Sequence, residues 1–230
     1  MTRMWALKGV ILCGVMGLIC LPALAESNLC YNGSFTVPND PFDGWNINYE
    51  WTGNSKLMNN HNKISFLPEF KGKKNVMRIT SLTAADKDTK VETSLMEYEA
   101  GARYKCTLDH YGELTGGEPV RVFFLGYAWR PGIAPTEVPQ LMDMRRVYKS
   151  EFGAGTGAAW KTVTATLPGP QISELAYKNL KKVRYMTVMI LMASEDCLGR
   201  SYIANVKVVK LTDKYKVTKG PSKPASGDDD

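Results

Sequence analysis

The segment VRYMTVMILM, residues 183–192, is apolar at both its odd and its even positions. Successive side chains of a strand point to opposite faces of a sheet, so this pattern indicates a strand that is covered on both sides. We therefore expect residues 183–192 to form a central strand. The segments before and after it decide what kind of sheet it belongs to.

Most other apolar segments alternate with period two, which is typical of half-buried strands. They are residues 45–51, 77–79, 104–108, 120–129, 162–167 and 202–211. Glycine and proline turns separate these segments, and only residues 172–182 (ISELAYKNLKK) show a helical pattern. The sequence therefore predicts an all-β sandwich or barrel with at most one short helix.

Residues 130–149 form the longest stretch without clear periodicity, and they include Pro131, Pro135 and Pro139. Long loops in compact domains often carry function, which is one interpretation of this segment. The other interpretation is a pair of strands whose pattern is obscured. The sequence leaves both open.

Residues 1–25 have the pattern of a secretory signal peptide. Arg3 and Lys8 supply positive charge, residues 9–21 are apolar, and Ala23-Leu24-Ala25 forms a small-x-small cleavage site. The alternative is a membrane anchor, but the apolar run is shorter than the ~20 residues that span a bilayer. We expect cleavage before Glu26, no membrane span in the remaining chain, and a periplasmic or secreted location.

Removal of this segment lowers the formal net charge from +6 to +4, because Arg3 and Lys8 leave with it. No dense Lys/Arg run remains that would grip a phosphate backbone, so we expect no nucleic-acid partner. Residues 212–230 are polar and end in three Asp, which predicts a disordered tail. Residues 26–211 are then one folded domain.

Few residues are available for catalysis or for metal binding. The chain has only 2 His, and it contains no H-E-x-x-H, G-x-S-x-G or G-x-x-x-x-G-K motif. Residues 153–158 (GAGTGA) resemble a dinucleotide-binding loop, but a predicted strand follows them where such a loop requires a helix. We therefore predict a protein that is not an enzyme and has no cofactor.

Three cysteines, Cys30, Cys106 and Cys197, lie beyond the signal segment. In an oxidising compartment we expect one disulfide among them, and all three pairings are open. The alternative is that a cysteine is a small buried apolar residue. Cys106 fits this alternative, because it alternates in phase with Tyr104 and Leu108.

Several aromatic residues near the ends of predicted strands are candidates for ligand binding. The candidate site residues are Trp51, Tyr111, Tyr127, Trp129 and Arg130. An aromatic ring can lie against the apolar face of a sugar ring, and an arginine can donate hydrogen bonds to its hydroxyls. The alternative is that these aromatic residues belong to the core, as we expect for Trp45 and Trp160.

The order of several short motifs resembles the galactose-binding-like jelly-roll carbohydrate-binding modules of the cellulose- and xylan-binding type. The motifs are residues 28–35 (NLCYNGSF), 43–45 (DGW), 77–79 (MRI), 100–104 (AGARY), 160–163 (WKTV) and 202–206 (YIANV). The resemblance implies a jelly-roll β-sandwich of two antiparallel sheets and non-catalytic binding of a glycan. The alternative is a cell-envelope structural or protein-interaction module, because a fold does not fix a function.

Those modules hold a structural calcium ion, to which a Glu and a closing pair of Asp contribute. Thr36, Ala204 and Asn205 occupy the matching positions here. Calcium sites usually include carboxylates, so the loss of all three argues against calcium, with Asp40 and Asp43 as partial substitutes. A disulfide of Cys30 is an alternative way to fix the first strand.

Overall fold

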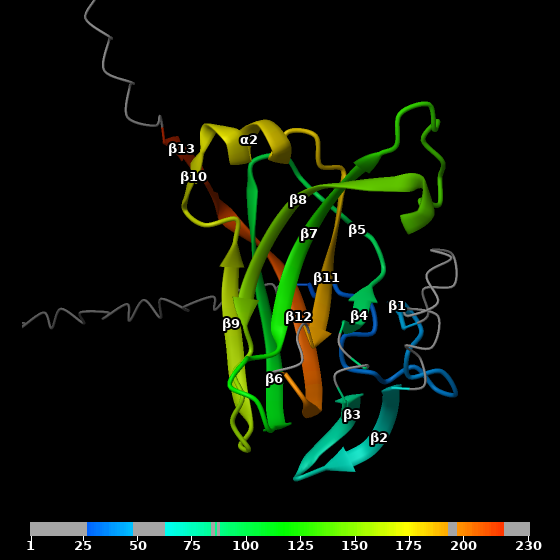
Figure 1. Ribbon diagram of the computed structural model, residues 1–230. Helices are drawn as coiled ribbons and strands as arrows, with labels where there is room; N and C mark the ends of the chain where they lie inside the picture. The colour runs from blue at the N-terminus through cyan, green and yellow to red at the C-terminus, as the bar shows by residue number, and fades with distance from the viewer. Residues whose placement is uncertain (1–26, 48–62, 84–85, 87, 193–196, 219–230) are drawn as a thin grey trace, which may run out of the picture.

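The computed structural model describes residues 27–47, 63–83, 86, 88–192 and 197–218. The predicted signal segment, Trp51 and residues 219–230 lie outside these ranges. Two antiparallel sheets pack face to face around one main core (Figure 1). The fold is the predicted jelly-roll β-sandwich.

One sheet, here called the β7 sheet, has the strand order β1-β4-β11-β7-β8, and β5 also pairs with β11. Its strands are β1 (Trp45–Asn46), β4 (Thr89–Thr93), β5 (Met96–Glu97), β7 (Arg121–Trp129), β8 (Met144–Gly153) and β11 (Tyr185–Met192). Strand β11 lies between β4 and β7, which confirms the central strand predicted from VRYMTVMILM.

The other sheet, the β6 sheet, has the order β2-β3-β12-β6-β9. Its strands are β2 (Ile64–Phe70), β3 (Lys73–Ser81), β6 (Ala102–Leu114), β9 (Lys161–Leu167) and β12 (Gly199–Lys214). Strand β2 contains Pro68 and was not predicted. It is an edge strand, where a proline costs no ladder hydrogen bond.

A few short elements complete the described chain. They are the 3-10 helix η4 (Leu141–Asp143), β10 (Gln171–Ser173), helix α2 (Glu174–Leu180) and β13 (Lys216–Thr218), which pairs in parallel with β10. Helix α2 confirms the one predicted helix, and the Ser173 side chain caps it by accepting from the Ala176 amide. No helix of the described segments is long and apolar enough to cross a membrane.

Two predicted boundaries differ from the structure. Strand β12 runs to Lys214 and β13 to Thr218, so regular structure continues past residue 211, where the tail was predicted to begin. Residues 130–149 combine both interpretations: an irregular connection leads through η4 into β8, which starts at Met144. The connection projects beyond the β7 sheet, at the upper right of Figure 1.

All three cysteines are buried and none of them forms a disulfide, so the predicted disulfide is absent. Burial raises the pKa of Cys30 and that of Cys106 to about 12 each, and the proximity of Cys106 adds to the effect on Cys30. A thiol with such a pKa stays protonated and is a poor nucleophile. The cysteines act as small apolar side chains of the main core.

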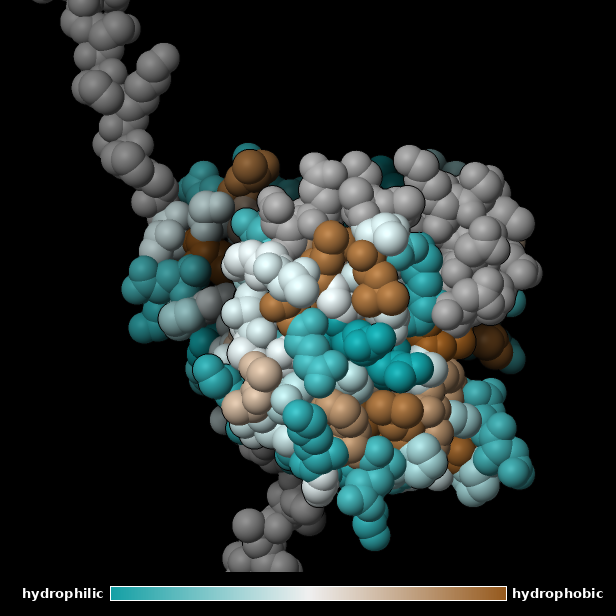
Figure 2. Space-filling model, turned by 60° about the horizontal axis from the view of Figure 1, so that its bottom comes forward, coloured by the Kyte–Doolittle hydropathy of each residue, from teal (hydrophilic) through white to brown (hydrophobic). Residues whose placement is uncertain are grey.

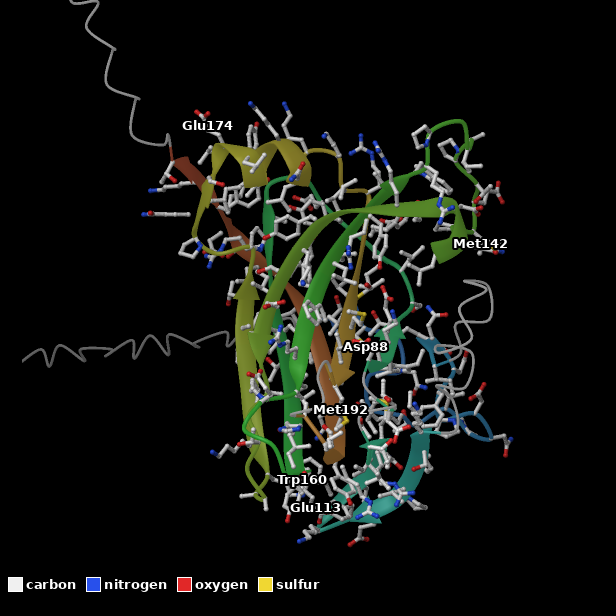
Figure 3. The ribbon with its side chains drawn as sticks, viewed as in Figure 1. Asp88, Glu113, Met142, Trp160, Glu174 and Met192 are labelled. Atoms are coloured by element: carbon white, nitrogen blue, oxygen red, sulfur yellow. The ribbon has the colours of Figure 1, made fainter. Side chains whose placement is uncertain are left out.

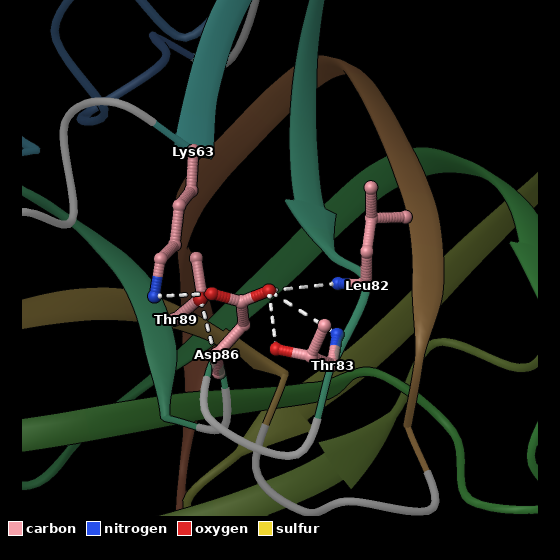
Figure 4. A network of polar contacts seen from close by, with 5 residues as sticks. All are labelled: Lys63, Leu82, Thr83, Asp86 and Thr89. Carbon is pink, nitrogen blue, oxygen red and sulfur yellow. Dashed lines mark hydrogen bonds and ion pairs between the residues drawn. The ribbon is translucent and has the colours of Figure 1, made fainter.

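The connection between β3 and β4 is fixed by the carboxylate of Asp86 (Figure 4). Its Oδ2 accepts from the backbone amides of Leu82 and Thr83 at 3.1 and 3.2 Å, and Lys63 Nζ lies 3.0 Å from Oδ1. Burial opposes ionisation, but these donors outweigh it and lower the pKa of Asp86. The network positions the start of β4, whose outward side chains line the site described next.

Candidate functional site

A groove of about 550 Å³ lies on the outer face of the β7 sheet. Strands β4, β7, β8 and β11 and the connection after β7 supply its lining. The lining residues are Lys90, Glu92, Leu125, Tyr127, Arg130, Pro131, Leu141, Met144, Arg145, Arg146 and Met189. The groove therefore has an aliphatic floor, one carboxylate and four cationic side chains.

The strand pattern explains the apolar floor. Phe123, Leu125 and Tyr127 alternate with the inward-facing Val122 and Phe124, and together with Met144 and Met189 they form an apolar cluster separate from the main core. Strand β11 adds Met189 through the same alternation, opposite Phe123. The sheet is thus apolar on both faces, as VRYMTVMILM predicts.

A register shift in the pairing of β7 with β8 brings Arg146 to this face. Leu125 pairs with Lys149 and Gly126 with Tyr148, but the next residue, Tyr127, pairs with Arg146. One residue of β8 is therefore extra, and such a bulge changes which side chains point outward beyond it. Without it, Arg146 would share the inward phase of Tyr148.

Glu92 lies at the bottom of the groove and is 4% exposed. Its Oε1 accepts from Tyr127 Oη at 2.7 Å and from Thr187 Oγ1 at 2.6 Å, so strands β4, β7 and β11 each contribute one group. Burial raises the pKa of Tyr127, and the neighbouring Glu92 carboxylate raises it further. A buried carboxylate of this kind needs such donors.

Cationic side chains surround this floor. Arg130 is oriented by its Nε, which donates to the Met144 carbonyl at 2.9 Å, while Arg145 and Arg146 are exposed. Burial lowers the pKa of Lys90, Arg146 lowers it further, and Glu92 acts in the opposite direction. Lys90 therefore lies close enough to Glu92 and Arg146 for their charges to affect its pKa.

Two smaller hollows adjoin the groove. One of about 270 Å³ shares Lys90, Arg146 and Met189 with it, and another of about 280 Å³ shares Leu141. Asp88 lines the first and Met142 the second, and Figure 3 labels these two residues well apart in the view. The combined site is long, which suits a chain-like ligand better than a compact one.

The structure brings together three of the five predicted site residues. Tyr127 and Arg130 line the groove, and Trp129 lies between them in sequence and in the same apolar cluster, with its ring edge-to-face with Tyr185 at 6.1 Å. Trp51 falls outside the described residues. Tyr111 lies on the other sheet.

Tyr111 belongs to an aromatic cluster on the outer face of the β6 sheet. Phe70 stacks on Tyr202 with ring centroids 3.7 Å apart, and Tyr111 and Trp160 pack around Phe70 at 5.3 and 6.3 Å. Trp160 is half-buried against this smaller cluster, whereas Trp45 lies in the main core, so the prediction of a core position is confirmed in full for Trp45 alone. Figure 2 brings this end of the molecule forward and shows small apolar areas separated by hydrophilic side chains.

Sequence reasoning missed Glu92, Lys90, Arg145 and Arg146. Lys90 and Glu92 alternate with the buried Val91 and Thr93, a signal of an outward-facing polar row that was present in the sequence. Arg145 and Arg146 gave no such signal, because the bulge in β8 breaks the alternation.

The residues at the calcium position of the resembling modules do not fit a calcium ion. Asn205 Nδ2 donates to Asp109 Oδ2 at 2.8 Å, and Asp43 Oδ2 accepts from Tyr31 Oη at 2.9 Å. The Asn32 amide donates to the carbonyls of Pro41 and Asp43, so it cross-links the loop without a cation. The described residues contain no group of three or more His, Cys, Asp or Glu placed to share a metal.

No family model and no curated protein sequence matches the chain. Among solved structures, the enzymatically active domain of tailspike protein 4 of bacteriophage CBA120 is similar with a TM-score of 0.50 and 10% identity, over 80% of this chain and 21% of that chain. A Stig cyclase from Fischerella sp. TAU has a TM-score of 0.48 and 13% identity, over 82% and 99%. A family 16 carbohydrate-binding module has a TM-score of 0.46 and 11% identity, over 79% and 99%. At these identities the likeness shows the fold alone.

Proposed function

We propose that the protein is an exported, non-catalytic module that binds a glycan in the groove of the β7 sheet. The observation that carries this proposal is the groove itself, which is long, open to solvent, apolar at its floor and bordered by hydrogen-bond donors. Sugar rings have apolar faces and hydroxyl edges, and they require this combination of surfaces. The signal-like residues 1–25 support export.

The proposed binding mode assigns a task to each part of the lining. Leu125, Met144 and Met189 lie under the ring faces, and Trp129 stacks at the end of the groove next to Arg130. Arg130 donates from its Nη atoms to sugar hydroxyls, because its Nε already donates to the Met144 carbonyl.

The carboxylates of the groove support binding over glycoside hydrolysis. Hydrolysis usually needs two carboxyl groups about 5–9.5 Å apart. Glu92 is the only carboxylate in the main groove among the described residues, and Asp88 in the adjoining hollow precedes it by four residues. Four residues of extended chain span about 13 Å, which is too long for either geometry.

The test is a glycan array together with titration calorimetry on the full exported chain and on Trp129→Ala. We expect binding to at least one polysaccharide and about fivefold weaker binding by Trp129→Ala, since one stacked ring contributes about 1 kcal/mol. Tyr111→Ala is the matched control, because its ring lies in the cluster on the other sheet. Absence of binding to any polysaccharide would refute the function, and unchanged binding by Trp129→Ala would refute the site.

A second candidate function is protein binding within the cell envelope. One observation favours it: the connection after β7 and helix η4 expose Ile133, Val138 and Met142, with Val138 at 76%. Exposed apolar side chains that gather in one place often mark an interface. A stoichiometric partner that co-purifies without added glycan and is lost in Val138→Asp would support this function.

A further inference from the structure

We propose that the groove is specific for a polysaccharide that carries carboxylate groups, such as a polymer of uronic acids. The inference rests on the proposed glycan-binding function and names the class of glycan. It follows from the charges that line the groove, which differ in number and in pairing from those elsewhere on the same sheet.

Cations outnumber carboxylates along the groove and the hollow that adjoins it. The cationic residues are Lys90, Arg130, Arg145, Arg146 and Lys149, and the acidic residues are Asp88 and Glu92. Glu92 is buried beneath the surface and already accepts from two hydroxyls. Lys149 is paired with Glu151 at 3.2 Å, but the four cations of the groove itself still outnumber its one carboxylate, and such an excess attracts an anionic ligand.

The two arginines of β8 provide the strongest part of this argument. Within the described chain, neither Arg145 nor Arg146 takes part in an ion pair or a side-chain hydrogen bond, and both are exposed. By contrast, Arg121 at the other end of β7 lies 3.4 Å from Glu118 and 3.9 Å from Glu151. Among the three arginines in the strands of the β7 sheet, the two that line the groove are thus the ones without a carboxylate partner.

A neutral glycan would fit this lining poorly. It would cover Arg145 and Arg146 without supplying a charge, and a cation that loses water without gaining an anion is destabilised. The Tyr127 hydroxyl of the floor is not free to bind a sugar hydroxyl in exchange, because it already donates to Glu92. Carboxylates of the ligand would supply the missing counter-charges.

Other anionic polymers fit less well than a carboxylated polysaccharide. A planar guanidinium fork matches a planar carboxylate through two parallel hydrogen bonds. A single-stranded nucleic acid needs several aromatic rings on which successive bases stack, and this groove offers Trp129 at one end, while Tyr127 in its lining is buried.

The test compares polygalacturonate with its fully methyl-esterified form, which has the same backbone without the charges. Affinity gel electrophoresis and calorimetry are run on wild type, on Arg145→Gln/Arg146→Gln and on Arg121→Gln as the matched control. Dextran sulfate, dextran and single-stranded DNA complete the panel. Thermal unfolding verifies that both variants are folded, which we expect because Arg145 and Arg146 are exposed and Arg121 is partly exposed.

We expect wild type to bind polygalacturonate at least tenfold more tightly than the methyl ester, and the difference to shrink as salt rises from 50 to 300 mM. The affinity of the double variant for polygalacturonate should be about tenfold lower than that of wild type, while its affinity for the methyl ester should not change. Arg121→Gln should bind as wild type does. Equal binding of the ester, or stronger binding of dextran sulfate or DNA, overturns this inference but leaves a binding groove. Failure to bind any glycan of the panel or of the array overturns the proposed function as well.

Discussion

The outer faces of the two sheets both carry apolar clusters, but only one of these clusters is closed. On the β6 sheet, Phe70 stacks flat on Tyr202, and the ammonium groups of Lys71 and Lys73 lie over the Tyr111 and Trp160 rings at 4.8 and 5.3 Å. On the β7 sheet, a groove of about 550 Å³ stays open between Tyr127 and Arg146.

The difference lies in what the chain itself supplies to each face. The hairpin of β2 and β3 ends in Phe70, Lys71 and Lys73, whose side chains cover the rings of the β6 sheet. On the β7 sheet, the strand next to β7 is β8, which ends the sheet and brings cations to the rim of the groove. Aromatic residues therefore stabilise the first face, whereas the second face can receive a ligand.

The largest expected effect is on the closed face. Tyr202→Ala should lower the free energy of unfolding by about 3–5 kcal/mol, because it removes a buried ring from a stack and leaves a cavity. Urea denaturation followed by tryptophan fluorescence measures this change. Glycan affinity of the folded fraction should stay at the wild-type value, since the ring lies on the other sheet.

Tyr202→Phe is the conservative control for this experiment. It keeps the stack on Phe70 and loses the hydrogen bond that Tyr202 Oη donates to Glu113 at 2.9 Å, so about 1 kcal/mol should be lost. If Tyr202→Ala instead abolished glycan binding while the protein remained folded, the assignment of the two faces would have to be exchanged.

The second expected effect uses the inner face of β6, the strand that carries Tyr111. His110 adjoins Tyr111 but points inward, where its Nε2 lies 3.0 Å from Ser201 Oγ. Burial lowers its pKa to about 4 from 6.5, although a hydrogen bond with the Ala154 backbone acts in the opposite direction. Between these pH values the unfolded chain binds a proton that the folded protein excludes, so stability falls as the pH falls.

The stability linked to His110 is fully present above pH 6.5, and about 3 kcal/mol is lost by pH 4. Urea unfolding from pH 7 to pH 4 should show this slope in wild type and a smaller slope in His110→Gln. Asp86 and Asp109 act in a lower pH range than His110. Because their pKa values are lowered, the stability that they contribute is lost below pH 3.8. An identical slope in His110→Gln would disprove the linkage.

Alternation predicted the sheets from the sequence because a strand must place its apolar side chains on one or both faces. VRYMTVMILM gave the central strand, and the phase of Tyr104 and Leu108 placed Cys106 in the core. Alternation could not distinguish the surroundings of Tyr111 from those of Tyr127, since both side chains point outward and both residues lie near the ends of their strands. Both rings are buried, and which of them lies beside an open groove depends on the β2–β3 hairpin and on the bulge in β8, which are non-local features.

The smallest expected effect is on the open face, at the buried carboxylate beneath the groove. Glu92→Gln keeps the shape and an acceptor for Tyr127 and Thr187, but it replaces two charge-assisted hydrogen bonds with neutral ones. We expect a loss of about 1–2 kcal/mol in urea unfolding and, because one negative charge leaves the groove, tighter binding of polygalacturonate. Such a result would show that the Glu92 carboxylate stabilises the fold and at the same time opposes the binding of an anionic ligand. A more stable Glu92→Gln protein would show instead that the cost of burying the charge exceeds the contribution of its two donors.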